Sequence, residues 1–379
     1  MHTDSCPFVA SPGARPPRLA GRAPLLDALG DRIAALQRGE PARPLAWLGR
    51  VGEGRTAVLH EAAKRAAAQG WAPAIATVTR EVPLEHELAR GIAAAVLHHG
   101  RKHPDEPKLV ELLGVARAYA AAHDLDLPLE APMAEISWPG TRLGDAGALF
   151  ERVADGLRSI GSGCFLALDD ADHADREVCR DVIAAAGQLA GAGRAFLLVV
   201  TGLPGTMPAE LTEQTVLGPL TPPDVLDALS WPAAERGIEI RHDTVAAIGR
   251  RTQGHPYFVQ AFAKAAWAHS DQHRVTPDDI TAVALDVERD LRASFFAPVL
   301  DGLSSSELRF VRAVADAGRR ATFAEVANRL GDPVRFDPAT SRLAPIRDDL
   351  LARGVLYVGE GEVLEFALPY LERYVRTTD

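Results

Sequence analysis

The sequence predicts an α/β fold built on a parallel sheet, followed by an all-helical part and a small unit of three helices and a hairpin. Three observations support this prediction. Short apolar runs alternate with helix-forming runs through the first half of the chain, which is typical of a parallel sheet. Residues 165–168 and 196–200 are apolar throughout, as expected of strands covered on both faces. From Leu220 to about residue 300 the pattern is helical only, before the final unit with the hairpin.

The composition is that of an ordinary soluble protein. Hydrophobic residues make up 47% and charged residues 24% of the 379 residues, enough for two or three domains with cores of their own. A net charge of −10 argues against a general binder of polyanions. The cysteines Cys6, Cys164 and Cys179 have no metal or disulfide spacing, and no apolar run is long enough to span a bilayer. We therefore expect a cytoplasmic protein.

The elements of the first half follow from the spacing of apolar residues. Leu25, Leu29, Ile33 and Leu36 share one face of a helix over residues 25–36. The other predicted elements are strands at 45–48, 71–78, 165–168 and 196–200, and helices at 56–69, 84–98, 108–123, 146–160 and 177–190. Between His99 and Gly147 several prolines predict an irregular insertion around the helix at 108–123.

The second half is predicted to contain four helices and then the hairpin unit. The four helices lie at 222–229, 242–251, 256–268 and 277–291. The last begins with a threonine cap, Thr276, a proline at the first position and acids in the first turn. Further helices at 307–317, 323–330 and 341–353, with strands at 355–358 and 363–366, predict a winged-helix arrangement.

A glycine-rich loop, residues 49–56, joins the first strand to the next helix. Strand, loop and helix form the context that a phosphate-binding loop needs, because glycines let N–H groups turn inward and the helix N-terminus is partly positive. The residues expected to hold a nucleotide here are Gly49, Arg50, Val51, Gly52, Glu53, Gly54, Arg55, Thr56 and Ala57. Arg55 stands where the pattern G-x-x-x-x-G-K-[ST] has lysine, and a planar fork replaces a compact ammonium.

Acids at the end of a later apolar strand could serve a metal and a water. Asp169 is the candidate Mg²⁺ ligand together with the hydroxyl of Thr56, at the end of the strand beside the phosphate loop. Asp170 is the candidate catalytic residue, which would orient or deprotonate the attacking water. The alternative is that these acids, with Asp172, only end a strand and start a turn.

Three further residues are candidates for contacts with the nucleotide. Thr201, at the end of the following strand, could sense the γ-phosphate, or it could be an ordinary threonine with satisfied hydrogen bonds. Pro256, in Gly254-His255-Pro256, could press against adenine or ribose, or simply begin a helix. Arg22 could lie near the base.

Three nearby histidines could be interpreted as a metal site, but the sequence does not favour that interpretation. His98, His99 and His103 have no carboxylate or thiol at ligand spacing. We interpret them as part of a solvated basic loop.

With these motifs in this order, the chain from Leu19 onward resembles the AAA+/STAND group of P-loop ATPases, especially the origin-recognition-like bacterial ATP-binding proteins. The resemblance rests on residues 21–22, 49–56, 165–170, 201–204 and 254–257 and on the terminal winged helix. It implies ATP and Mg²⁺ bound between an α/β domain and a helical lid, in a switch that rearranges its domains or oligomerises on nucleotide exchange.

The predicted domains follow from the motifs and the changes of pattern. They are a disordered tail at 1–16, a P-loop nucleotide-binding domain at 17–218 with the insertion at 99–147, a helical lid at 219–300 and a winged-helix domain at 301–379.

The leading functional hypothesis is an ATP-binding regulatory switch whose hydrolysis is weak or absent, because Arg55 and Asp170 depart from the lysine and glutamate expected of the Walker A and Walker B motifs. One alternative is a pseudo-ATPase scaffold that binds no nucleotide. The other is a winged-helix DNA-binding regulator. Residues 303–379 carry eleven arginines and twelve acids, and a DNA reader normally has a basic surface. Arg342, Arg347 and Arg353 lie on the expected recognition helix, but so do two aspartates. A protein partner or self-association is also expected, and no membrane.

Overall fold

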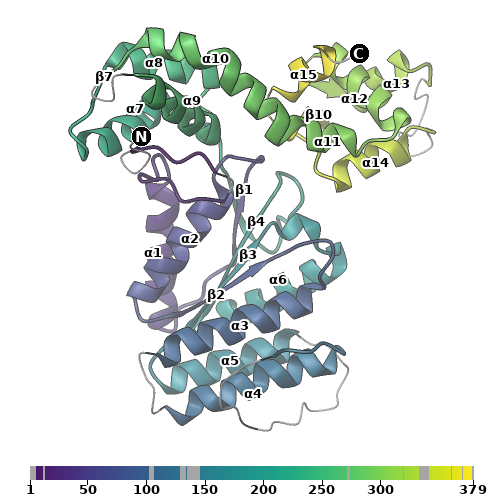
Figure 1. The fold of residues 1–379 in the computed structure, drawn as a ribbon. Coiled ribbons are helices and arrows are strands. Elements are labelled where there is room, and N and C mark those ends of the chain that lie inside the picture. Colours follow the sequence, from purple (N-terminus) through teal and green to yellow (C-terminus); the bar gives the residue numbers. More distant parts are fainter. Residues whose placement is uncertain are drawn as a thin grey trace.

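The computed structural model describes residues 6–11, 13–101, 106–128, 134, 146–270, 274–318, 320–332, 341–359, 361–368 and 370–377. In Figure 1 a sheet with helices on both faces forms one part of the molecule. A helical segment lies at the loop end of the sheet, and the C-terminal unit lies beside that segment. None of the helices in the described ranges has the length and apolar character needed to cross a membrane.

The central sheet has five parallel strands in the order β2-β3-β4-β1-β5. They are β1 (Leu45–Leu48), β2 (Ala72–Thr77), β3 (Cys164–Asp169), β4 (Phe196–Gly202) and β5 (Glu213–Val216). The first four confirm predicted strands, whereas the exposed edge strand β5 was not predicted. The expectation that the strand of Asp169 lies beside the phosphate loop is wrong, because β4 lies between β3 and β1. Local sequence patterns do not encode strand order.

Helices cover both faces of the sheet, as the apolar strands predicted. Phe165 and Leu197 point into the core shared with α1 (Ala23–Gln37) and α2 (Arg55–Ala68). Leu166 and Leu198, one residue further, point into the opposite core. That core is shared with α3 (Leu84–Gly100), α4 (Pro107–Ala122), α5 (Ala146–Ser159) and α6 (Arg176–Gly191). Each of the six helices confirms a predicted one to within a few residues.

The predicted insertion is only partly described. Helix α4 is present and buries Leu112 and Tyr119 against the sheet domain. Residues 102–105, 129–133 and 135–145 lie outside the described ranges, and with them His103 and three of the prolines on which the prediction rested.

The helical segment, defined here as residues 222–301, contains the four predicted helices. They are α7 (Pro222–Ala234), α8 (His242–Thr252), α9 (Pro256–His269) and α10 (Pro277–Leu291). The Thr276 side chain caps α10 as predicted, in a reciprocal pair with Asp279. The expectation of helices only is wrong, because β6 (Glu239–Ile240) pairs with β7 (Arg274–Val275). A two-residue pairing leaves no periodic pattern to detect. A π-helix, Arg292–Phe296, and α11 (Ala297–Asp301) end the segment.

The C-terminal unit, defined here as residues 305–377, contains the predicted three helices and hairpin. The helices are α12 (Ser305–Ala317), α13 (Phe323–Arg329) and α14 (Ala344–Ala352). The hairpin is β9 (Leu356–Val358) with β10 (Val363–Phe366), and the short β8 (Ala321–Thr322) extends it to three antiparallel strands. Helix α15 (Leu371–Thr377) was not predicted. The unit has the elements of a winged helix, and that designation stays a prediction.

The N-terminal segment differs from the disordered tail that its composition predicted. Phe8 is 2% exposed and belongs to the same buried cluster as Val225 and Phe258 of the helical segment. The Val9 amide donates to Gln260 Oε1 of α9 at 3.1 Å. Figure 1 shows the described part of this segment running between the helical segment and α1. One large apolar side chain is enough to anchor a segment that is otherwise rich in proline, alanine and serine.

We expect Phe8→Ala to lower the free energy of unfolding by about 3 kcal/mol, because it empties a buried aromatic site. Urea denaturation of the full chain measures the change. Ser11→Ala, at an exposed position of the same segment, is the matched control and should have no effect. Equal stabilities for the two variants would mean that Phe8 is not anchored.

Candidate functional site

A cavity of about 280 Å³ lies where the glycine loop, the start of α2, the N-terminal segment and α9 meet. Several predicted site residues line it: Val51, Gly52, Glu53, Gly54, Arg55, Thr56, Ala57, Asp170, Arg22 and Pro256. Four predicted site residues are not part of the described cavity lining: Gly49, Arg50, Asp169 and Thr201. The structure therefore brings most of the predicted site residues to one cavity and places these four outside its lining.

The loop has a conformation that its glycines make possible. Gly52 and Gly54 have φ values of 79° and 91°, in the left-handed region that L side chains rarely adopt. Among the described residues no side chain caps α2, and the Val58 amide donates to the Gly54 carbonyl at 3.0 Å to close the first turn. The amides of Arg55, Thr56 and Ala57 are therefore left without an acceptor in the helix. An uncapped helix N-terminus behind a glycine loop fits a phosphate.

Three contacts hold the carbonyl groups of this loop. The Val51 carbonyl accepts from His255 Nε2 at 2.9 Å, and the Gly52 carbonyl accepts from the Tyr257 amide at 3.3 Å. The Glu53 carbonyl accepts from Arg22 Nη2 at 3.1 Å. In a planar trans peptide the N–H points opposite to the C=O, so these contacts turn the amides of Gly52 and Gly54 away from the contacting groups. The loop is thus braced from outside.

Arg22 braces the loop through two hydrogen bonds from its Nη2 to backbone carbonyl groups. It is 8% exposed and also donates to the Gly218 carbonyl at 2.8 Å. Burial lowers the pKa of Arg22, and the charge of Glu53 opposes that shift. The residue borders the cavity where the base was expected, but its hydrogen bonds go to the loop and to the chain after β5.

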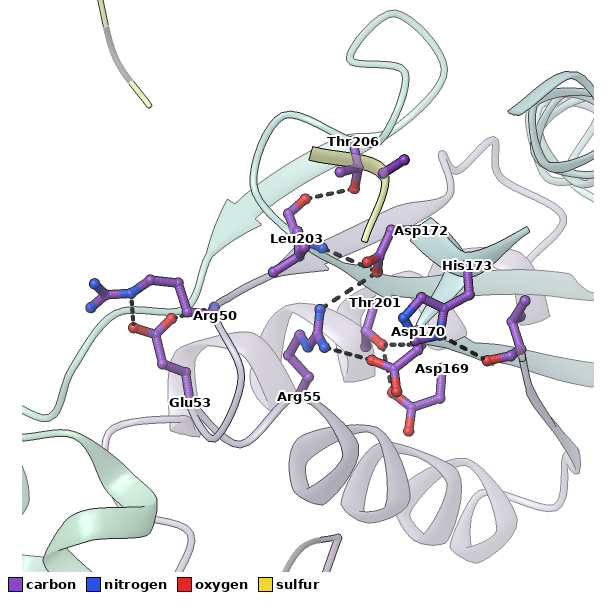
Figure 2. Close-up of polar contacts among 12 residues, drawn as sticks. Arg50, Glu53, Arg55, Asp169, Asp170, Asp172, His173, Thr201, Leu203 and Thr206 are labelled. Carbon is purple, nitrogen blue, oxygen red and sulfur yellow. Dashed lines mark hydrogen bonds and ion pairs between the residues drawn. The ribbon is translucent and has the colours of Figure 1, made fainter. Parts of the chain in front are cut away.

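Arg50 and Glu53 form a pair on the other side of the loop. The Glu53 carboxylate is buried and accepts from the Arg50 amide at 2.7 Å and from Arg50 Nε at 2.8 Å. Figure 2 shows this pair apart from Arg55. The Arg50 side chain thus stabilises the loop through Glu53, and its predicted contact with a nucleotide stays a prediction.

Arg55 reaches across to the acids that follow β3. Its Nη2 lies 2.6 Å from Asp170 Oδ1, and its Nη1 lies 3.6 Å from Asp172 Oδ1 (Figure 2). Nη1 is buried and has no hydrogen-bond partner among the described residues. The guanidinium therefore has unused donor capacity next to the uncapped helix start, which also fits a phosphate.

Asp170 is held in an uncommon environment. Its φ of 56° places a non-glycine residue in the left-handed region. Burial raises the pKa of Asp170, the neighbouring Asp169 and Asp172 raise it further, and Arg55 opposes them. Its side chain is still 28% exposed and is the acid that faces the cavity.

Asp169 and Thr201 form a buried pair behind Asp170. The Thr201 hydroxyl donates to Asp169 Oδ1 at 2.6 Å and accepts from the Asp170 amide at 3.0 Å. Asp169 is 3% exposed and Thr201 is fully buried. Thr201 reaches both acids because β4 lies between the loop strand and the acid strand. Thr201 thus contacts the two acids directly, whereas the predicted contact with a γ-phosphate stays a prediction.

Two residues of the site were not among the predicted ones. Asp172 accepts from the Leu203 amide at 3.2 Å and faces Arg55. The sequence contained a signal for it, the third acid in Asp169-Asp170-Ala171-Asp172, which looked like a turn. The other is His255, which was noted only as part of the helix start before Pro256.

His255 joins α9 to the glycine loop. It is 2% exposed, its Nε2–H donates to the Val51 carbonyl, and its Nδ1 accepts from the Phe258 amide at 3.4 Å. These partners fix the neutral tautomer. Burial lowers the pKa of His255 to about 3. A side chain at Gly52 would lie 2.6 Å from the His255 ring, so this contact requires glycine.

We expect the protein to lose stability on acidification because of His255. A pKa of about 3 in the folded state, below the ordinary 6.5, means that the unfolded chain binds the proton first as the pH falls. The stabilisation is complete above pH 6.5 and lost progressively toward pH 3. At pH 5 the loss from this group is about 2 kcal/mol. Urea denaturation between pH 7 and pH 5 measures it.

His255→Gln, which keeps a donor for the Val51 carbonyl, should flatten this dependence on pH. The same change at the exposed His269, at the end of α9, should leave the slope as it is. A slope unaltered in His255→Gln would show that the imidazole is not buried neutral.

The described residues contain no group of three or more His, Cys, Asp or Glu side chains arranged to hold a metal ion. A Mg²⁺ ion at this site would therefore depend on Thr56, on a single acid such as Asp169 and on water and phosphate oxygens, as Mg²⁺ commonly does beside a nucleotide.

Comparisons with solved structures find proteins of similar fold. The structure is similar to the Walker-type ATPase paby2304 of Pyrococcus abyssi, with a TM-score of 0.60, 13% identity and coverage of 98% of this chain and 99% of that one. It also matches the Aeropyrum pernix ORC1 protein in complex with DNA at a TM-score of 0.43 and 18% identity, covering 95% of this chain and 93% of that chain. The likeness to the Walker-type ATPase extends over nearly the whole of both chains and concerns the fold.

The match to a sequence family covers only the C-terminal part of the chain. Residues 293–375 match a family described as "Domain of unknown function (DUF8462)". A search among curated proteins found no match.

Proposed function

We propose that this protein binds ATP with Mg²⁺ in the cavity and acts as a nucleotide-dependent regulatory switch with weak or absent hydrolysis. The observation that carries the proposal is the uncapped start of α2 behind the glycine loop, which opens on a cavity shared with α9. The amides of Gly52, Gly54 and residues 55–57 would surround the phosphates, and the unused donors of Arg55 would pair with them.

The other residues have roles that follow from where they lie. Thr56 borders the cavity and would hold Mg²⁺ directly, while Asp169 would act through water from behind the wall. Bound Mg²⁺ supplies positive charge that offsets the charge of the phosphates. The cavity wall from Pro256 would meet the base or ribose, and Arg22 would keep the loop open.

Hydrolysis is proposed to be weak because of Asp170. This acid would have to accept a proton from water, but it is paired with Arg55 at 2.6 Å, and its side chain is one methylene shorter than glutamate. The ion pair opposes the rise in the pKa of Asp170 that burial causes, and it directs the carboxylate toward Arg55 rather than toward a water.

The helical segment is proposed to be a lid that moves with the nucleotide. His255 and Tyr257, at the start of α9, contact two successive carbonyl groups of the glycine loop. Any shift of the loop toward a phosphate therefore changes the contacts that hold α9. This is how occupancy of the cavity would alter the arrangement of the domains.

We propose that the C-terminal unit is a winged helix used for contacts between domains or with a protein partner, rather than a DNA reader. Two of the three arginines of its expected recognition helix are engaged: Arg347 lies 4.7 Å over the Phe323 ring, and Arg353 Nη1 lies 2.8 Å from Glu307 Oε1. The third, Arg342, has an 88% exposed side chain that lies 3.9 Å from Asp332. Tyr370 donates to the Arg251 carbonyl of the helical segment at 3.0 Å. Arginines held in this way are poorly placed for phosphates of DNA.

The proposal is tested by titrating a fluorescent ATP analogue into the full chain with Mg²⁺. We expect saturable binding with a Kd below about 1 mM. Thr56→Ala should weaken binding about tenfold in Mg²⁺ and leave it unchanged in EDTA, because only the metal contact is lost. Failure to saturate below about 1 mM would favour the pseudo-ATPase scaffold.

Arg55→Lys should raise ATP turnover about tenfold, since a shorter ammonium can reach phosphate while leaving Asp170 less tightly paired. Phosphate release under saturating ATP measures turnover, and the analogue titration is repeated on the variant. Arg55→Met, which keeps length without charge, is the control and should not raise turnover. If both binding and turnover appear only in Arg55→Lys, the native chain is a scaffold.

A further inference from the structure

We propose that Asp172 is a positioning residue that, together with Asp170, holds Arg55 on the acid side of the site, so that a nucleotide phosphate has to compete with carboxylates for this guanidinium. The inference rests on the proposed function, because it concerns how the same cavity is regulated. Asp172 has no place in the predicted set of nucleotide or metal residues.

The first argument is the geometry of the fork. One terminal nitrogen of Arg55 makes a hydrogen-bonded ion pair with Asp170 at 2.6 Å. The other lies 3.6 Å from Asp172 Oδ1, within ion-pair range but without a hydrogen bond. The side chain is 11% exposed, so these charges interact with little screening from solvent. Figure 2 shows the guanidinium directed at the two aspartates.

The second argument is that the two carboxylates differ in how firmly they are held. Asp172 is 7% exposed, and its Oδ1 accepts the Leu203 amide at 3.2 Å. A side chain added at Gly202 would lie 3.0 Å from the same oxygen, so the backbone packs closely around it. Asp170 is 28% exposed. Asp172 is therefore the fixed partner, and Arg55 is the group that has to move.

The third argument is the chemistry of the two possible partners of Arg55, the carboxylates and a phosphate. A guanidinium fork pairs well with either carboxylate or phosphate oxygens, and a phosphate can satisfy both terminal nitrogens at once. With only one of these nitrogens hydrogen-bonded to the acids, the resting pairing is incomplete. A triphosphate would therefore compete with the aspartates for Arg55, and a guanidinium that stays close to Asp170 keeps that acid paired. The affinity for phosphate and the strength of the aspartate pairs thus oppose each other.

The test is a double-mutant cycle on nucleotide affinity in the full chain, with the fluorescent ATP analogue and Mg²⁺ as the probe. Asp172→Asn keeps an oxygen for the Leu203 amide and removes the charge that holds Arg55. We expect it to bind the analogue about fivefold more tightly than the native chain. A merely structural role for Asp172 would give weaker binding or none.

Removing a negative charge near a phosphate tightens binding through simple electrostatics as well, so the cycle is completed in Arg55→Met. There the effect of Asp172→Asn should fall to less than about twofold. An equal gain in both backgrounds would overturn the inference. Asp175→Asn is the matched control: Asp175 caps α6, asparagine caps equally well, and affinity should not change.

Two further outcomes are decisive. If Asp172→Asn does not fold, as judged by its thermal unfolding, Asp170→Asn removes the other partner of Arg55 and should tighten binding in the same Arg55-dependent way. If the native chain binds the analogue but neither variant binds it more tightly, this inference fails and the proposed function stands. If no variant binds nucleotide, both fail.

Discussion

The ion pair between Arg55 and the acids after β3 is the interaction on which the site depends. It joins Arg55, the first residue of α2, to Asp170, which follows β3. In the sheet, β4 lies between β3 and β1, the strand that precedes the glycine loop. Thr201 of that intervening strand bonds to both Asp169 and Asp170. The start of α2, strand β4 and the end of β3 are therefore connected by direct polar contacts, and a change in the position of Arg55 alters the electrostatic environment of Asp170 and Asp172.

A second set of contacts makes the loop a shared part of two domains. Its carbonyl groups are held by His255 and Tyr257 from the helical segment and by Arg22 from the chain before α1. Because these three groups take the outward carbonyls, the amides of Gly52 and Gly54 point the opposite way, while the Glu53 amide donates to the Arg50 carbonyl. The same contacts connect the conformation of the loop to α9. In the proposed function, preparation of the loop for phosphate and its coupling to the helical segment would therefore depend on the same contacts.

The sequence predicted the elements of the fold well, because strands such as residues 165–168 and capped helices such as the one after Thr276 carry local patterns. It could not predict what depends on strand order: β4 lies between the loop and the acids, which brings Thr201 to Asp169. The burial of individual side chains also could not be predicted from composition. Phe8 is anchored within a segment of disordered composition, and His255 is a buried neutral donor rather than an ordinary helix start. The sequence also could not predict that Asp172 faces Arg55, because that contact depends on the fold.

The two departures from the expected motif, arginine for lysine and aspartate for glutamate, turn out to be partners in one ion pair. Considered separately, each weakens a catalytic site. Considered together, a longer base compensates for a shorter acid, and the distance between loop and strand end is still bridged. Arginine also adds a second terminal nitrogen, which faces Asp172, a contact that a single ammonium could not make at the same time. The altered pair therefore keeps both charges and restrains the Arg55 side chain on the acid side of the site. This geometry differs from that expected if the two substitutions had only removed catalytic groups.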